Sequence, residues 1–184
     1  MTLLITGLAV FIAVHLFTAA RDLRAGVIAR LGEWPYKGLY SLISLAAFFM
    51  ISRGFGASPD VGLYTPPEWA RPVTAVQVLA AFISLAGYRL KGHIKAKLRQ
   101  PMLVGVAVWA IAHLLANGDQ AGVLLFGSFL AYSVIAIVLA NGREPAPDFV
   151  PNPRHDVIAL VAGVVLFLGT VSYLHEGLSP ASLI

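Results

Sequence analysis

Six apolar stretches, separated by short segments rich in proline, glycine and charge, place the strongest limit on how this chain folds. They are Leu3–Ala20, Tyr36–Ser52, Val73–Leu90, Met102–Ala116, Ala121–Ala140 and Val157–Leu174. Most approach the length of about 20 residues that an α-helix needs to cross the hydrocarbon core of a bilayer. A backbone in hydrocarbon has to satisfy its hydrogen bonds within its own segment, as the α-helix does. The sequence therefore predicts an all-α, polytopic integral membrane protein, with about six transmembrane helices in one bundle and residues 1–184 in a single domain.

The low content of charged residues supports this class of protein. Charged residues make up 12% of the chain, whereas about 25% is usual in a soluble domain, and the mean hydropathy is +0.80. The net charge of +4 does not indicate a nucleic-acid partner, because the basic residues cluster beside the predicted spans. The expected surroundings are membrane lipid, and the polar segments leave no room for a second, soluble domain.

Lysine and arginine are distributed unevenly over the connections between the spans. Eleven lie in the first, third and fifth connections, and only Arg53 and Arg71 lie elsewhere. Since these residues favour the cytoplasmic side of a membrane, the odd-numbered connections are expected in the cytoplasm. The pattern predicts a multi-pass protein of the bacterial inner membrane with both termini outside the cytoplasm.

Local signals predict where helices begin and how they pack. Pro101 suits the first turn of a helix, where its missing N–H costs nothing, and Asp119 is placed to cap the helix that follows it. Small residues recur at four-residue spacing in Ala159–Gly163 and in Gly118–Gly122. Such spacing predicts close approach between helix backbones in a membrane.

Two of the five histidines, His15 and His113, lie within apolar stretches. An ionisable side chain in hydrocarbon is costly, which makes it a candidate for function, and imidazole is the commonest protein ligand of metals. Two interpretations fit: each ring hydrogen-bonds a neighbouring helix, or the two rings together bind a metal or clamp a haem iron. The absence of cysteine excludes disulfides, thiolate catalysis, iron–sulfur clusters and covalent c-type haem. A haem in this chain is therefore bound without covalent links.

The remaining histidines and two arginines are less distinctive. His93 lies in the basic stretch 89–99, which indicates a ring that is solvated or faces lipid headgroups. His155 and His175 lie at opposite ends of the last predicted span, so they cannot share one site. Arg21 and Arg24 follow the first span, where they either anchor it at the cytoplasmic edge or pair with haem propionates, because guanidinium binds carboxylate in a bidentate manner.

Two groups of motifs carry a family resemblance. The first is Arg21-Asp-Leu-Arg24, running into Leu31-Gly-Glu-Trp-Pro-Tyr-Lys-Gly-Leu-Tyr-Ser-Leu42. The second is Arg99-Gln-Pro-Met-Leu-Val-Gly105, followed by Trp109-Ala-Ile-Ala-His-Leu-Leu-Ala-Asn-Gly-Asp119 and Leu125-Phe-Gly-Ser-Phe129. Together they resemble the NnrU family, bacterial membrane proteins often associated with denitrification, to which plant 15-cis-zeta-carotene isomerase also belongs. The likeness covers roughly residues 10–135 and fades over the last span.

The resemblance implies a haem b cofactor. In the plant isomerases two histidines hold a non-covalent haem b, one in the first span and one in an Ala-His-x-Leu motif, and these match His15 and His113. It further implies a cis/trans isomerase that acts on a lipid-soluble polyene through redox-dependent ligand switching, with ferrous iron assisting rotation about the double bond. The alternative within the same resemblance is a non-catalytic haem-binding accessory protein or sensor in denitrification and nitric oxide metabolism.

One departure from the family pattern leaves a third function open. The family's Arg-His-Pro motif reads Arg99-Gln100-Pro101 here, so any role of that histidine is absent from this chain. The pattern Arg-x-Pro-x-x-x-Gly is also similar to that of integral-membrane methyltransferases, which keeps methyl transfer from S-adenosylmethionine as an alternative. The acidic C-terminal motif of those enzymes is not evident after Arg143.

The depth of the two histidines adds a requirement. At a rise of about 1.5 Å per residue, His15 lies about 8 Å from the cytoplasmic end of its span at Ala20, and His113 about 18 Å from Pro101. Two axial ligands of one iron lie at similar depth. The haem interpretation therefore requires a tilt or displacement of the first span, or a non-axial role for one histidine.

Overall fold

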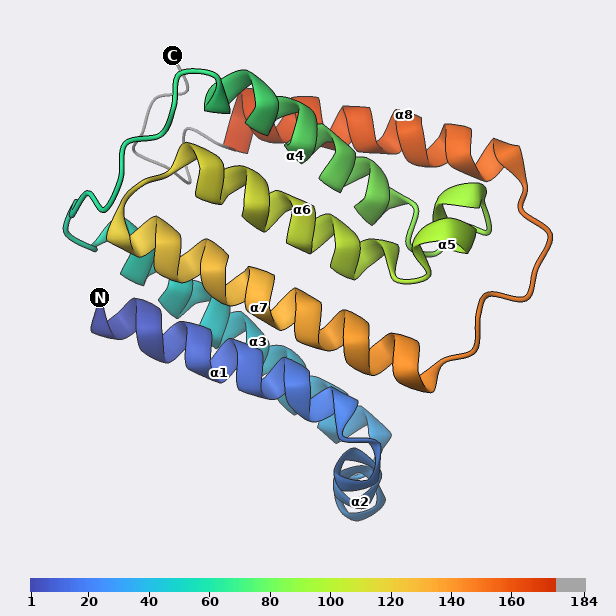
Figure 1. The fold of residues 1–184 in the computed structure, drawn as a ribbon. Helices are drawn as coiled ribbons and strands as arrows, with labels where there is room; N and C mark the ends of the chain where they lie inside the picture. Colours follow the sequence, from blue (N-terminus) through green and yellow to red (C-terminus); the bar gives the residue numbers. More distant parts are fainter. Residues whose placement is uncertain (175–184) are drawn as a thin grey trace. The chain divides into compact units, whose positions relative to one another are not determined.

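The structure is a computed structural model that describes residues 1–174, and this part of the chain is helical almost throughout. Its elements are α1 (Thr2–Ala19), α2 (Arg21–Leu31), α3 (Glu33–Gly56), α4 (Ala70–Ala86), α5 (His93–Leu98), α6 (Pro101–Ala116), α7 (Gln120–Arg143), α8 (Pro153–Gly169) and a π-helical turn, η1 (Thr170–Leu174) (Figure 1). No β-strand forms in the described residues, and the predicted all-α class is confirmed.

All six predicted apolar stretches form helices. Within residues 1–174, four helical segments are long and apolar enough to cross a membrane, namely Thr2–Ala19, Glu33–Gly56, Gln120–Arg143 and Pro153–Tyr173. The other two, α4 and α6, have 17 and 16 residues, which corresponds to about 24–26 Å against a hydrocarbon core of about 30 Å. Large apolar side chains such as Leu42, Val138 and Val165 are exposed on the long helices, as expected of helices that face lipid.

Two of the connections contain helices that the apolar pattern does not reveal. The 11 residues of α2 begin with Asp22 in the first turn and end with Arg30 in the last, charges that suit the helix dipole at each end. Gly32 then turns the chain into α3 with a φ of 86°, a left-handed conformation that glycine adopts without strain. The six residues of α5 lie in the basic stretch before α6.

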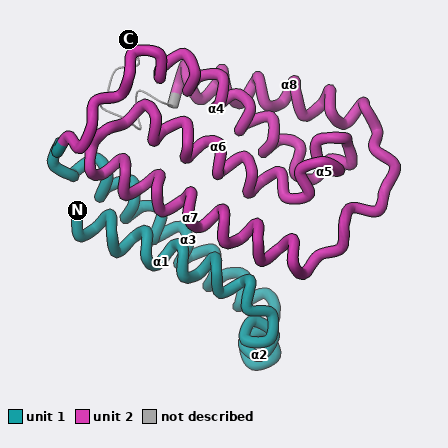
Figure 2. Tube along the Cα trace, in the orientation of Figure 1, with its two compact units in different colours: residues 1–61 teal, residues 62–184 magenta. Residues whose placement is uncertain are grey.

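The chain divides into two compact units, residues 1–61 (unit 1) and residues 62–184 (unit 2) (Figure 2). In unit 1, α1 and α3 pack closely as an antiparallel pair, with α2 between them in the sequence. Leu4 of α1 and Ala47 of α3 are fully buried at this contact. The backbones approach so closely that a Cβ atom at Gly54 would lie 2.3 Å from the backbone nitrogen of Leu4.

In unit 2, four helices lie side by side in the order α8, α4, α6 and α7, each packed on the next (Figure 1). A Cβ atom at Gly163 of α8 would lie 2.6 Å from the Cα of Ile83 in α4, and Ala159 is buried one turn earlier. The close packing predicted for Ala159–Gly163 is therefore confirmed. The Thr74 hydroxyl of α4 donates a hydrogen bond of 2.9 Å to the carbonyl oxygen of Ala112 in α6.

The predicted helix starts are also confirmed, but the spacing of Gly118 and Gly122 has another cause than helix packing. Pro101 occupies the first turn of α6, and Asp119 caps α7 by accepting the N–H of Gly122 at 2.7 Å. Gly118 precedes α7, and a Cβ atom on it would collide with the carbonyl oxygen of Tyr64. The prediction of a helix–helix contact there was wrong, because these glycines serve the turn and its cap.

The connections of unit 2 gather at two opposite ends of the helix layer. At one end the third and fifth connections meet, where Asn152 donates its N–H to the carbonyl oxygen of Lys91 at 2.9 Å. At the other end the second and fourth connections meet, where Leu63 donates to the carbonyl oxygen of Gly118 at 2.7 Å. The basic connections of this unit thus share one end, as the alternation of the predicted spans requires.

Candidate functional site

His15 lies in the last turns of α1, in unit 1, and its side chain is half-buried. Its Nδ1 donates a hydrogen bond of 2.7 Å to the carbonyl oxygen of Phe11, one turn earlier in the same helix. The ring also stacks on Phe11, with 4.0 Å between ring centroids. Tyr40 of α3 approaches from the other helix, with 5.5 Å between its ring centroid and that of His15.

His113 lies near the end of α6, in unit 2, in an environment built on the same plan. Its Nδ1 donates to the carbonyl oxygen of Trp109, one turn earlier, at 2.9 Å. Trp109 and Phe126 flank the imidazole, with centroid distances of 5.0 Å and 4.6 Å. The side chain is half-buried, as that of His15 is.

This shared arrangement selects one state of each imidazole. A carbonyl oxygen can only accept a hydrogen bond, so Nδ1 carries the proton and, in the neutral ring, the lone pair lies on Nε2. Histidines that bind metals usually donate their other N–H to a carbonyl or carboxylate in this way, which orients the ring. In both histidines this hydrogen bond runs to a carbonyl oxygen of the same helix.

The buried side-chain atoms of unit 1 that lack a hydrogen-bond partner include Nε of Arg24 and the hydroxyl oxygen of Tyr36. The Arg24 guanidinium lies 5.8 Å from the centroid of the Tyr36 ring, and Tyr36 stacks on Tyr40 at 6.4 Å. Buried polar groups are nearly always hydrogen-bonded, so the unpaired atoms of Arg24 and Tyr36 are candidates for contact with a bound polar group. Arg21, by contrast, is exposed at the start of α2.

The end of α6 that carries His113 is held in place by its own C-cap residue, Asn117, and by Tyr64 of the connection before α4. The amide of Asn117 donates to the carbonyl oxygen of His113 at 2.8 Å. The Tyr64 hydroxyl donates to the carbonyl oxygens of Leu114 and Asn117. Burial, together with the charge of Asp119, raises the pKa of the Tyr64 phenol, so the hydroxyl keeps the proton that these contacts use.

An apolar hollow of about 200 Å³ lies between α4 and α6 and is lined in part by Trp109, the residue that contacts His113. Its lining includes Phe82, Leu85 and Trp109, and Trp109 also makes edge-on contacts with Phe126 and Phe129. Pockets for small molecules usually measure about 300–1,000 Å³. The hollow therefore accommodates part of an apolar molecule.

Among residues 1–174, no group of three or more metal-binding side chains is placed to hold a metal ion. A structural or catalytic zinc site takes three or four ligands from the protein. Haem iron, in contrast, receives four nitrogens from the porphyrin and needs only one or two protein ligands, commonly histidine. His15 and His113, which belong to no such group, suit the second case.

The other residues singled out in the sequence have structural contacts. The Arg99 guanidinium donates to the carbonyl oxygens of Asn141 and Glu144 at the end of α7, at 3.3 Å and 2.7 Å. The amide of Gln100 donates to the carboxylate of Glu144 at 2.8 Å. Arg99 and Gln100 thus hydrogen-bond the C-terminal end of α7, where Glu144 is the C-cap residue.

The remaining histidines have other surroundings than His15 and His113. His93 pairs with Asp156 of α8 at 2.8 Å, whereas His155 is half-buried in the first turn of α8. His175 lies outside the described residues.

Sequence reasoning did not identify Tyr36, Tyr40 and Phe126 as neighbours of the histidines. A signal for the tyrosines was present, because residues four apart on a helix share one face, and Tyr36 and Tyr40 have that spacing. Which helix this face contacts cannot be read from the spacing. The position of Phe126 against His113 arises only when α7 packs on α6.

Comparison with known proteins identifies the family. The model of the family described as NnrU protein matches residues 3–182, so the likeness extends through α8 and beyond the motifs noted above. No curated protein and no solved structure matches the chain. With nearly its whole length matched by one family model, this chain belongs to the NnrU family.

Proposed function

We propose that this protein binds one non-covalent haem b, with His15 and His113 as the iron ligands. The observation that carries the proposal is the matched preparation of the two rings. Each donates Nδ1–H to the carbonyl of the residue four positions earlier and lies against the aromatic ring of that same residue. With the proton on Nδ1, the neutral ring carries its lone pair on Nε2, the form in which imidazole binds iron.

The buried polar atoms of unit 1 fit the acidic part of a haem. Its propionates are carboxylates, and a guanidinium together with a phenol hydroxyl supplies the donors that a carboxylate accepts. Arg24 and Tyr36 lie at the end of a row of ring contacts that starts at His15. We assign Arg24 to a propionate, with Tyr36 as a second donor. We also assign Arg21, the neighbouring arginine of α2, to the propionates, as the sequence predicts.

A bound haem would supply a redox-active iron in an apolar setting, and we propose a lipid-soluble polyene as the substrate of a redox-gated cis/trans isomerisation. The protein's part is to orient the two imidazoles and to exclude water with aromatic side chains, including Phe11, Trp109 and Phe126. The hollow beside Trp109 has the apolar character that part of a polyene requires. Co-expression with a carotenoid pathway separates an isomerase, which changes the cis/trans product ratio, from a haem-binding accessory protein, which leaves it unchanged.

The cofactor assignment is tested by the absorption spectrum of the purified full-length protein. We expect a Soret band, a b-type spectrum after conversion to the pyridine complex, and complete extraction of the pigment into acidified acetone, because the chain has no cysteine to retain it. A protein that is purified without pigment and takes up no added haemin would refute the proposal.

Removal of the Arg24 guanidinium is expected to weaken haem binding without abolishing it. In Arg24→Gln a propionate loses a charge-assisted hydrogen bond, worth about 1.5–3 kcal/mol, so the dissociation constant for haemin should rise about 10- to 100-fold. Titration of the apoprotein with haemin, followed by absorption, measures this change. Arg30→Gln is the matched control, since Arg30 is an exposed arginine in the last turn of the same helix. Equal affinity in the two variants would remove Arg24 from the site.

A further inference from the structure

A second hollow, of about 540 Å³, opens at the basic end of unit 2, where α4, α5 and α8 meet. This volume lies within the usual range of ligand pockets, about 300–1,000 Å³. Its apolar part is formed by Ala80 and Ile83 of α4 and by Leu98 of α5, and its polar part includes His93, Lys97 and Asp156. The hollow is therefore amphipathic, with an apolar wall on a helix of the bundle and polar groups where the chain leaves it.

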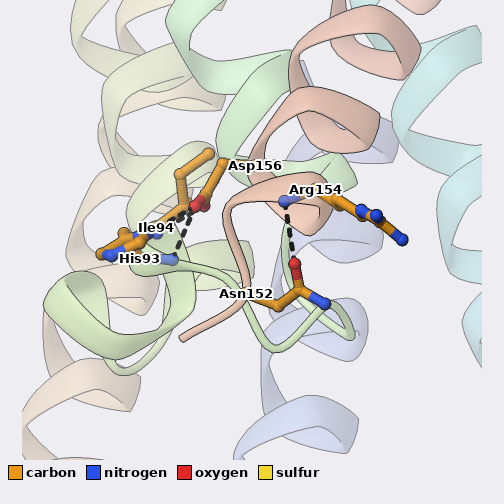
Figure 3. Close-up of polar contacts among 5 residues, drawn as sticks. All are labelled: His93, Ile94, Asn152, Arg154 and Asp156. Atoms are coloured by element: carbon orange, nitrogen blue, oxygen red, sulfur yellow. Dashed lines mark hydrogen bonds and ion pairs between the residues drawn. The ribbon is translucent and has the colours of Figure 1, made fainter. Parts of the chain in front are cut away.

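Asp156 holds α5 firmly against the start of α8 (Figure 3). One carboxylate oxygen accepts the backbone N–H of His93 at 2.9 Å and its Nδ1–H at 2.8 Å, and the other accepts the N–H of Ile94 at 2.9 Å. The contact is so close that a Cβ atom on Gly92 would lie 2.3 Å from the carboxylate. These contacts fix the ring of His93 and occupy both oxygens of Asp156.

The cations around the hollow are not matched by acidic residues of the same segment. Residues 87–100 contain five lysines and arginines and no aspartate or glutamate. His93 and Lys97 are exposed and lie four residues apart on α5, so they share one face of that helix. The carboxylate of Asp156 is engaged with backbone N–H groups of α5, and Lys97 is the lysine of this basic segment that lines the hollow. Lys97 therefore presents a positive charge to whatever enters the hollow.

We propose that this hollow binds one anionic phospholipid, with its phosphate on Lys97 and one acyl chain along Ala80 and Ile83. The positive charge of Lys97 complements the phosphate, and the apolar wall suits the chain. Basic pockets between membrane helices on one side of the bilayer recognise anionic headgroups in this way. The site lies wholly within unit 2 and does not depend on the haem proposal.

Native mass spectrometry of the full-length protein in a neutral detergent tests the site. Phosphatidylglycerol is titrated against phosphatidylcholine of the same chain length, and we expect one phosphatidylglycerol to be retained with clear preference. Lys97→Gln should weaken its binding about fivefold, since one basic residue near an anionic lipid contributes about 1 kcal/mol. Lys95→Gln is the matched control, because it removes the same charge from the same helix but does not line the hollow, and it should weaken binding clearly less than Lys97→Gln does.

Three results would overturn the proposal. Equal weakening by Lys95→Gln would show diffuse attraction to a basic segment instead of a defined site. Equal retention of phosphatidylcholine would show that the phosphate charge is not recognised. Displacement of the lipid by millimolar inorganic phosphate would show that the acyl chain does not contribute. Circular dichroism of each variant confirms that the helices are intact.

Discussion

Replacement of either His15 or His113 by alanine is expected to lower the haem occupancy of the purified protein by more than about tenfold, because even changes behind a metal ligand often cost about 10–100-fold in affinity. Each substitution removes an imidazole whose Nδ1–H is already fixed by a backbone carbonyl. The measurement is the ratio of Soret absorbance to protein, together with haem extracted per chain.

The chain offers matched controls for this experiment. His93→Ala and His155→Ala remove histidines of unit 2 that do not belong to the aromatic contacts around His15 or His113. They should leave the Soret band unchanged. His93 is engaged with Asp156, and His155 lies in the first turn of α8. If His15→Ala and His113→Ala both kept the full spectrum, the ligand assignment would be wrong. If each single variant kept half of the haem, the two histidines would serve separate haems.

The second large effect is expected in folding, from a single methyl group at Gly54. The added Cβ of Gly54→Ala would lie 2.3 Å from the backbone nitrogen and 2.7 Å from the Cα of Leu4. Backbone atoms cannot move aside as the end of a side chain can, so α1 and α3 have to separate. Overpacking typically costs about 1–3 kcal/mol, and we expect a loss at the upper end of that range. Reversible unfolding in mixed micelles, followed by circular dichroism, measures the free energy of unfolding.

Gly38 of the same helix provides a control with the opposite sign. A Cβ atom there meets nothing within 4 Å, and alanine is more favourable than glycine in a helix by about 0.5–1 kcal/mol. Gly38→Ala should therefore stabilise the protein slightly, while Gly54→Ala destabilises it. A similar change in both variants would contradict the close approach of α1 and α3.

Much of the helical architecture could be predicted because its causes are local. Apolar stretches predicted six helices, Pro101 marked the start of α6, and Asp119 marked the cap of α7. The helix α5 was missed because its six residues are too short and too basic to show a pattern. Its partner, Asp156, lies far away in the sequence and touches it only once α8 has packed on α4.

The candidate site divides in the same way. The sequence by itself determined that two histidines lie in apolar helices, that no cysteine is present to attach a haem covalently, and that the chain carries NnrU motifs, since each depends on residue type and neighbouring residues alone. Only the tertiary structure decided that Tyr40 faces His15, that Phe126 faces His113, and that Arg24 and Tyr36 bury polar atoms without hydrogen-bond partners. The reason is physical: a helical period states which residues share a face, whereas the packing of side chains between helices selects which faces meet.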